Sequence, residues 1–180
     1  MEEGDKIDWD MIEGVARRLA DVSFVFVGPD DGRGEVGRLA ALPNVRLLGP
    51  RPYDQVPAYV QAFDACWVPF RQDRVGRAAN PVKLYEYLAV GKPVVSTPVA
   101  DVESFEGLVR VGRTPEEFAA RLREVLANPE TDAAQRIAFA ARNSWRERAS
   151  AYVSFAAALP GASRPLDAVC SGPPVGVAVE

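Results

Sequence analysis

Histidine is absent from the 180 residues of this sequence, and its absence narrows the chemistry that the protein can perform. Histidine is the commonest general base in enzymes, and it completes the serine–histidine and cysteine–histidine pairs of many hydrolases. It is also a ligand in most zinc sites. Any chemistry must therefore use aspartate, glutamate, lysine, arginine, tyrosine or backbone groups, and the sequence gives no reason to predict a metal site.

Cysteine is scarce, and long apolar runs are lacking. Of the two cysteines, Cys66 lies in the apolar run DACWVPF and Cys170 lies in a Gly/Pro-rich tail. This usage argues against a disulfide framework and fits a reducing compartment, so we predict a cytoplasmic location. The N-terminus is acidic and lacks the apolar centre of a signal peptide. No run approaches the roughly 18 apolar residues of a membrane span.

The charge and composition are those of an ordinary globular protein. The net charge of −4 gives no reason to expect nucleic acid or an anionic membrane as a partner, although it does not exclude a local basic pocket. Apolar residues make up 48% of the chain and charged residues 26%, and the length is sufficient for one α/β domain with a core.

Short apolar runs alternate with helical patterns along the sequence. The runs predict strands at 23–27, 45–48, 65–69, 94–97 and 108–111. The helical spacing of apolar residues predicts helices at 8–19, 35–42, 53–63, 81–90, 115–127 and 132–159. The last of these is expected to break at Asn143 and Ser144. Residues 160–180 lack any period and are predicted to be a disordered tail, which leaves a domain over residues 1–159.

This alternation predicts a three-layer, Rossmann-like α/β fold with a parallel sheet joined by right-handed crossovers. Such sheets bind ligands beyond the carboxyl ends of their strands. The loops expected there are 28–32, 49–53, 70–79 and 98–105. A doubly wound domain normally opens with a central strand, whereas this sequence opens with a helix. Either the chain is a fragment or the sheet lacks its first strand.

The segment from Asn80 to Pro98, NPVKLYEYLAVGKPVVSTP, carries the strongest functional signal. With Asn80 as N-cap, it opens a helix on which Lys83 and Glu86 lie three residues apart on one face. A helix N-terminus and a lysine suit a diphosphate, because free N–H groups, the helix dipole and a positive charge converge there. A carboxylate one turn later can accept both hydroxyls of a ribose. Together these features predict a nucleotide-diphosphate pocket.

The pattern N-P-x-K-x-x-E-Y-x-A-x-G-x-P-V-V resembles the nucleotide-sugar site in the C-terminal half of GT-B-type glycosyltransferases. Two further stretches, VRLLGPRPYDQVPAY at 45–59 and FDACWVPF at 63–70, agree with this family. The resemblance spans residues 8–157. It implies a Rossmann-like domain that binds a nucleotide-sugar, UDP- or GDP-linked, as substrate and without a further cofactor.

The resemblance also implies roles for individual residues. Glu86 matches the glutamate that holds the ribose of the nucleotide. Lys83 matches a basic position near the diphosphate or the donor sugar, where it would stabilise the departing diphosphate. The donor-binding residues implied around them are Arg51, Pro52 and Tyr53 at the turn that binds the base, and Arg77 and Asn80 in the loop that faces the sugar. Without the resemblance, an exposed glutamate on a capped helix is more often only a solvated charge.

Two departures from the family pattern bear on activity. Ala78 stands where many retaining members have the first glutamate of a Glu-x7-Glu motif. In the family, the C-terminal half begins with a strand and a Gly-rich turn that contact the diphosphate, and this sequence is expected to start just after them. The N-terminal half, which binds the acceptor and in inverting members carries the catalytic base, is not found in the sequence either. We therefore expect this chain alone to be inactive, with the acceptor, a glycan or a lipid-linked sugar, held by an N-terminal domain. The sequence does not identify the catalytic residues, and it does not show whether the transfer retains or inverts the anomeric configuration of the sugar. Peripheral contact with a membrane also stays open.

Alternatives from other classes also stay open. The chain could be a non-catalytic nucleotide-binding or interaction module, or a gene fragment whose fold survives without chemistry. It could be a sugar-nucleotide epimerase of the same fold, against which the absence of histidine argues. A dehydrogenase is disfavoured because no Gly-x-Gly-x-x-Gly follows a strand.

Overall fold

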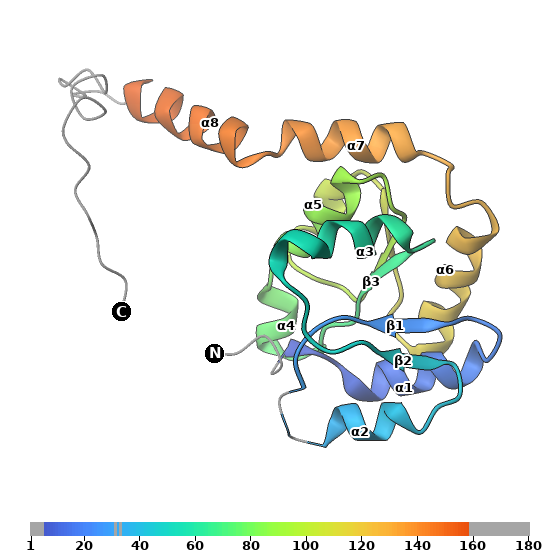
Figure 1. The fold of residues 1–180 in the computed structure, drawn as a ribbon. Helices are drawn as coiled ribbons and strands as arrows, with labels where there is room; N and C mark the ends of the chain where they lie inside the picture. Colours follow the sequence, from blue (N-terminus) through green and yellow to red (C-terminus); the bar gives the residue numbers. More distant parts are fainter. Residues whose placement is uncertain (1–5, 31, 33, 159–180) are drawn as a thin grey trace. The chain divides into compact units, whose positions relative to one another are not determined.

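The computed structural model describes residues 6–30, 32 and 34–158. The chain divides into two compact units, Met1–Ala141 and Arg142–Glu180, and each is described by itself. Figure 1 shows the order of the elements. All strands of the described residues lie in the first unit, which therefore holds the sheet surfaces that position a site.

Short strands alternate with helices through the first unit, as the sequence predicts. The strands are β1 (Phe24–Phe26), β2 (Val45–Leu47), β3 (Cys66–Val68), β4 (Val94–Ser96) and β5 (Val109–Val111). The α-helices are α1 (Trp9–Arg18), α2 (Glu35–Ala40), α3 (Val56–Ala62), α4 (Arg74–Ala78), α5 (Val82–Ala89), α6 (Pro115–Ala127) and α7 (Ala133–Arg142). Two 3-10 turns are η2 (Tyr53–Gln55) and η3 (Val102–Phe105).

The strands pair in parallel throughout the described residues, which confirms the predicted α/β class with parallel strands. They form two separate sheets, one in the order β1-β2 and one in the order β3-β4-β5. Phe24 lies opposite Val45 in the first sheet, and Val94 lies between Cys66 and Val109 in the second. No backbone pairing joins the two sheets in the part of the chain that the structure describes.

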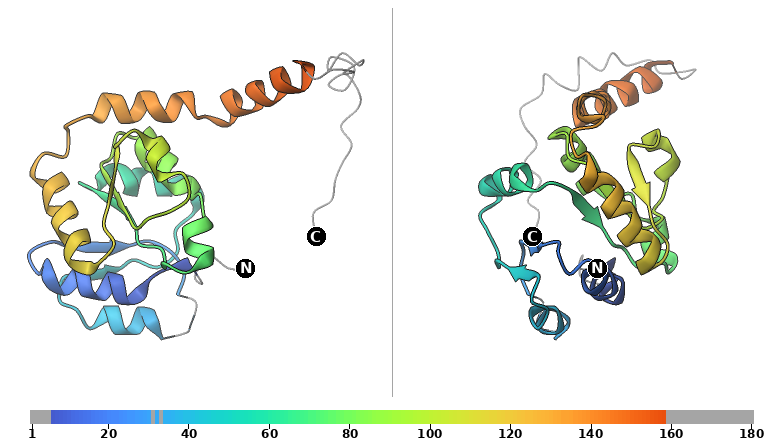
Figure 2. Two further views of the ribbon diagram at one scale, coloured as in Figure 1. Left: turned by 180° about the vertical axis from the view of Figure 1, so that it is seen from behind. Right: turned by 90° about the vertical axis from the view of Figure 1, so that its right-hand side faces the viewer.

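Capping and amphipathic spacing explain the helices that cover the strands. Asp8 caps α1 by accepting a hydrogen bond from the Met11 N–H (2.9 Å), and Thr114 caps α6 by accepting one from the Glu117 N–H (3.3 Å). The two helices lie within the ranges 8–19 and 115–127 that the sequence predicts. The two helices lie side by side (Figures 1 and 2).

Two apolar clusters form the core. In one, Trp67 of β3 packs against Phe24 and Phe26 of β1 and against Phe118 of α6, with ring centroids 5.1–5.9 Å apart. In the other, buried side chains of β3–β5 pack against α5, η3 and α7. Cys66 is buried, and its burial raises the pKa of the thiol to about 12.

Several local predictions are wrong. The segment predicted as a loop at 71–79 contains the helix α4, which Asp73 caps. The helix predicted at 53–63 opens with the 3-10 turn η2, and the α-helix α3 begins only at Val56. Asn80 does not cap α5: the cap residue is Pro81, whose extended backbone (ψ 125°) delays the helix by one residue.

The long C-terminal helical stretch breaks where the sequence predicts. Helix α7 ends at Arg142, and α8 (Trp145–Ala158) begins in the second unit, where the Ser144 hydroxyl accepts a hydrogen bond from the Glu147 N–H (3.3 Å). The domain limit at residue 159 stays a prediction, and the tail predicted at 160–180 lies outside the described residues. No helix in the described ranges combines the length and apolar character needed to span a membrane.

Candidate functional site

The four loops predicted to face a ligand follow β1, β2, β3 and β4 at their carboxyl ends. They are joined in pairs by backbone hydrogen bonds, one pair for each sheet. The Gly28 N–H donates to the Gly49 carbonyl (3.1 Å) in the first sheet, and the Ala100 N–H donates to the Ala79 carbonyl (3.0 Å) in the second. Each sheet therefore presents a connected surface at the edge where parallel sheets bind ligands.

A buried hydroxyl fixes the loop that follows β3. The Thr97 Oγ1 accepts a hydrogen bond from the Phe70 N–H (2.9 Å) and donates to the Phe70 carbonyl (2.8 Å). The Gln72 side-chain amide adds a bond to the Pro98 carbonyl (3.2 Å). Because Thr97 is fully buried, these bonds form away from competing water and hold the start of the loop firmly.

Helix α4 is built into the same loop by a cap and a close approach. The Asp73 carboxylate accepts bonds from the N–H groups of Val75 (3.0 Å) and Gly76 (2.8 Å), and the Gly76 bond is the main reason that the pKa of Asp73 is lowered. A Cβ at Gly76 would lie 1.8 Å from the Arg71 carbonyl oxygen, so only glycine fits. In the sequence, Asp73 is a signal for the start of a helix. A helix of five residues is too short to show the apolar spacing by which a helix is recognised.

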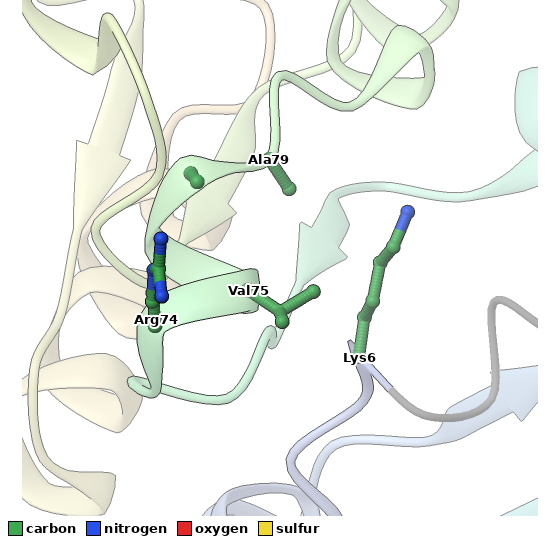
Figure 3. Close-up of a pocket in the computed structure, with 5 residues that line it drawn as sticks. Lys6, Arg74, Val75 and Ala79 are labelled. Atoms are coloured by element: carbon green, nitrogen blue, oxygen red, sulfur yellow. The ribbon is translucent and has the colours of Figure 1, made fainter. Parts of the chain in front are cut away.

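A pocket of about 570 Å³ lies beside α4, and its lining is Lys6, Arg74, Val75, Ala78 and Ala79. Figure 3 shows the Lys6 side chain extending into it toward Ala79. Lys6 is held there because its carbonyl accepts a bond from the Arg71 N–H (2.7 Å). The segment ahead of α1 is thereby paired with the segment that follows β3.

The charge of this pocket is positive. Neither Lys6 nor Arg74 forms an ion pair with another residue of the described ranges, and the remaining lining side chains are small or apolar. Two cations that have no carboxylate partner among the described residues can bind an anion such as a phosphate. The sequence analysis did not identify Lys6, because its position depends on a contact between segments more than sixty residues apart.

Helix α5 continues directly from the pocket wall at Ala79. Its Leu84 and Leu88 are fully buried, and the Tyr85 ring packs against Phe105 (5.0 Å) and Phe139 (6.3 Å). These contacts fix the rotation of the helix about its axis.

The C-terminal end of α5 is anchored by a buried guanidinium. The Arg136 side chain donates to the Gly91 carbonyl (2.7 Å) and also to two carbonyls of the α6–α7 connection. Burial lowers the pKa of Arg136. The helix that carries the sequence motif is thus held at its far end as well as along its apolar face.

The polar side chains of α5 stand away from this packing. Lys83 is half-buried and Glu86, three residues further on, is exposed. Within the described residues, Glu86 has no hydrogen-bond or ion-pair partner. Its carboxylate is therefore available to a ligand. Arg77 and Asn80, also exposed, lie just ahead of α5 on the same stretch of chain.

The predicted base-binding residues lie on the other sheet, after β2. Arg51 folds against α3: its Nε donates to the Tyr59 hydroxyl (3.0 Å) and its guanidinium lies 5.9 Å from the Tyr59 ring centroid. Pro52 is exposed, and Tyr53 is 83% exposed. Arg77, Asn80, Lys83 and Glu86 thus lie on α4, α5 and the segment between them, and none of the four lines the pocket, whereas the other three residues follow β2. No set of three or more potential metal ligands occurs in the described ranges.

Parallel strands with a cationic pocket at their carboxyl ends are typical of α/β domains that bind ligands at this edge. Residues 7–128 match the model of the family described as glycosyl transferases group 1, and the chain therefore belongs to this family.

Two relatives illustrate the family. Over 94 residues the chain is 42% identical to TuaH of Bacillus subtilis strain 168, named as a teichuronic acid biosynthesis glycosyltransferase. That match covers 51% of this chain and 24% of the relative. Over 128 residues the chain is 32% identical to a D-inositol 3-phosphate glycosyltransferase of Corynebacterium urealyticum, with 64% of this chain and 28% of the relative covered. The chain thus spans about a quarter of the length of these curated relatives.

Proposed function

We propose that this chain is the donor-binding part of a glycosyltransferase and that it binds a nucleotide-sugar, UDP- or GDP-linked, at the carboxyl ends of β3 and β4. The observation that carries this proposal is the continuity of the cationic pocket with α5. Ala79 lines the pocket, and the exposed carboxylate of Glu86 follows two turns later on a helix fixed by its core contacts. In this proposal the unit is a three-layer Rossmann-like domain.

The two ends of the site suit the two ends of a nucleoside diphosphate. Lys6 and Arg74 attract the diphosphate, and the N–H groups at the start of α5 add the positive end of a helix dipole. Lys83 neutralises negative charge as the diphosphate departs. Glu86 accepts hydrogen bonds from both ribose hydroxyls, which favour an ionised carboxylate.

The neighbouring surface takes the base. Backbone groups near Arg51 and Pro52 bind its polar edge, and the exposed Tyr53 ring is free to stack against it. Because the Arg51 side chain is engaged with Tyr59, the backbone of this turn is the part left available. Arg77 and Asn80 face the sugar.

Transfer to an acceptor requires a further part that binds the acceptor. The relatives are about four times as long as the segments matched here, and their printed names describe whole glycosyltransferases. We infer that the isolated chain binds the donor without transferring the sugar. We also propose a cytoplasmic location, because the sparse use of cysteine in the sequence fits a reducing compartment.

Calorimetric titration of the purified chain with UDP, GDP and ADP tests the proposal. Binding of UDP or GDP is expected, with Glu86→Ala weakening it about tenfold or more through loss of two charge-assisted hydrogen bonds. Lys6→Ala and Arg74→Ala should each weaken binding, and the affinity of the unmodified chain should fall as salt is added.

Matched controls separate a ligand contact from a general loss of charge. Asp64→Ala removes an exposed carboxylate at the amino end of β3, and Arg17→Ala removes an exposed guanidinium on α1. Both should leave the affinity unchanged. Undetectable binding of all three nucleotides, or equal weakening by the controls, would reject the proposed donor site.

A further inference from the structure

A second pocket of the first unit lies at the amino ends of β4 and β5. Pro93, which precedes β4, and Leu108, which precedes β5, line it together with the end of α6 and the connection from α6 to α7. Its volume is about 170 Å³. The polar residues of this pocket, which we term the amino-end pocket, are Arg110, Glu124, Asn128, Thr131, Asp132 and Arg136. None of them belongs to the proposed donor site, so the pocket is a separate candidate for a ligand.

The guanidinium of Arg136 is the buried charge of this pocket. Arg136 is 5% exposed. It donates one hydrogen bond to each of three backbone carbonyls, those of Gly91 (2.7 Å), Pro129 (2.7 Å) and Thr131 (2.6 Å). Because a guanidinium has five N–H groups, some of them remain without an acceptor among the described residues. No carboxylate of the described ranges forms an ion pair with it. Arg136 therefore brings a positive charge and spare donors to the wall of the pocket.

The second guanidinium of the pocket belongs to Arg110 of β5. It is half-buried and close enough to Arg136 for the two like charges to repel each other. Burial lowers the pKa of Arg136 and outweighs the opposing effect of the Asp132 and Glu130 carboxylates, and the charge of Arg110 lowers this pKa further. A guanidinium nevertheless stays protonated in proteins. An anion bound between the two arginines would therefore offset their repulsion.

Two carboxylates also line the pocket, and they differ in what they already bind. The Glu124 carboxylate lies between two guanidiniums, 3.2 Å from the Arg110 Nε and 2.8 Å from the Arg121 Nη1. Its hydrogen bond to Arg121 is the main reason that the pKa of Glu124 is lowered. The Asp132 carboxylate is exposed and has no hydrogen-bond or ion-pair partner among the described residues. Asp132 is therefore the group of the pocket that should oppose an anion, and its removal provides a test.

Neutral donors and the size of the pocket indicate which anion fits. The Asn128 side-chain amide and the Thr131 hydroxyl belong to lining residues, and neither group has a hydrogen-bond partner among the described residues. Guanidinium, amide and hydroxyl groups together can donate to the several oxygens of a phosphate. The volume of the pocket equals that of roughly six water molecules in the liquid. This space holds a phosphate with a few attached atoms and is too small for a whole nucleotide.

We propose that the amino-end pocket binds the phosphate group of a small molecule, either free phosphate or a compact phosphate ester, between Arg110 and Arg136. The two guanidiniums donate charge-assisted hydrogen bonds to the phosphate oxygens, and Asn128 and Thr131 add neutral ones. A nucleotide-sugar does not compete for this pocket, because both of its phosphates are esterified and it has no terminal phosphate to insert. This inference does not depend on the proposed donor site, which lies at the other end of the strands.

NMR titration of the full chain with inorganic phosphate and with glycerol 3-phosphate, at constant ionic strength, tests the proposal. The amides of Gly107, Asn128 and Thr131 should shift and reach saturation with at least one of the two compounds. Glycerol and sodium chloride, as controls, should not shift them. Tighter binding of glycerol 3-phosphate would assign the pocket to a phosphate ester, and tighter binding of inorganic phosphate would assign it to the free ion. Shifts at Ala79 report on the other pocket and are read separately.

Two variants move the affinity in opposite directions. Arg110→Gln removes a cation and releases Glu124, and it should weaken the binding measured at Asn128 about tenfold or more. Asp132→Asn removes the opposing carboxylate and keeps a residue type that tolerates the φ of 63° at this position. It should tighten binding about threefold through loss of like-charge repulsion. Because a misfolded variant would not bind more tightly, this gain cannot come from damage to the fold.

The matched control is Arg113→Gln, which removes an exposed arginine beyond the carboxyl end of the same strand and should leave the affinity unchanged. The absence of saturable shifts at Gly107, Asn128 and Thr131 with both phosphate compounds would overturn the proposal. Weaker binding in Asp132→Asn, or equal weakening in Arg110→Gln and Arg113→Gln, would overturn it as well.

Discussion

The two sheets of the first unit are built from strands of equal length and similar composition, yet they are buried to different extents. In β4, Val94, Val95 and Ser96 are 0% exposed, whereas Val25 and Phe26 of β1 are half-buried. The residue types do not explain this difference, because both strands are apolar and carry β-branched residues or aromatics. Strand β4 has neighbours on both sides and β1 has one. Burial in this fold therefore depends on the number of neighbouring strands.

The surfaces for a ligand differ in the same way. After β3 and β4, the Thr97 hydroxyl and the Gly76 close approach hold α4 and the cationic pocket in place. After β2, the turn that carries Pro52 and Tyr53 is exposed. The well-buried sheet thus supports the part of the site that would meet the charged diphosphate.

A matched pair of substitutions gives the largest expected effect. Val95→Ala should lower the free energy of unfolding by about 2.5 kcal/mol, because two fully buried methyl groups are lost and a cavity remains. Val25→Ala, at the same register position of a half-buried strand, should cost about 1 kcal/mol or less. Urea unfolding of both variants measures the difference. Equal losses would show that the two sheets are equally buried in solution.

Removal of the buried hydroxyl should have a somewhat smaller effect on stability. Thr97→Val removes two hydrogen bonds between the hydroxyl and the backbone of Phe70 and should cost about 2 kcal/mol, at about 1 kcal/mol for each bond. Because the same bonds hold the loop that carries α4, nucleotide affinity should fall as well. Thr114→Val, which removes only the cap of α6, should cost about 1 kcal/mol and leave affinity intact. If Thr97→Val kept its nucleotide affinity, the hydroxyl would not be needed to position the site.

The smallest expected effect is on the pH dependence of the free energy of unfolding, through the thiol of Cys66. Burial raises the pKa of this thiol from 9.0 to about 12, so the folded state keeps the proton more tightly than the unfolded state. The resulting stability is fully present below pH 9 and is lost as the pH rises toward 12. Between pH 8 and pH 10 the unmodified chain should lose about 1 kcal/mol more than Cys66→Ala. Identical pH profiles of the two proteins would show that the thiol is accessible.

The sequence predicted most of the elements because their signals are local. The apolar spacing of α1 and α6 gives their buried faces, and Thr114 marks the start of α6 by capping, whereas Asp8 was placed inside its helix and is the cap residue. Helix α4 was missed because five residues cannot show a period. The prediction that Asn80 caps α5 was wrong because Pro81 keeps an extended backbone and is itself the cap residue.

Features that depend on distant contacts could not be predicted in this way. Lys6 reaches the pocket only because its segment pairs with the residues that follow β3. The division of the strands into two sheets depends on which edges find partners, and the five apolar runs do not encode that. Glu86 and Lys83 were identified from their motif, and their roles toward a ligand remain predictions.

The most direct test of the donor site is an NMR titration of the isotopically labelled chain with UDP- and GDP-sugars. We expect the largest amide shifts at Lys6, at residues 74–80 and along α5 near Lys83 and Glu86, with Asn128 and Thr131, at the opposite end of the second sheet, unperturbed. Shifts confined to that opposite end, or no shifts with either donor, would contradict the assignment of the donor to the carboxyl ends of β3 and β4.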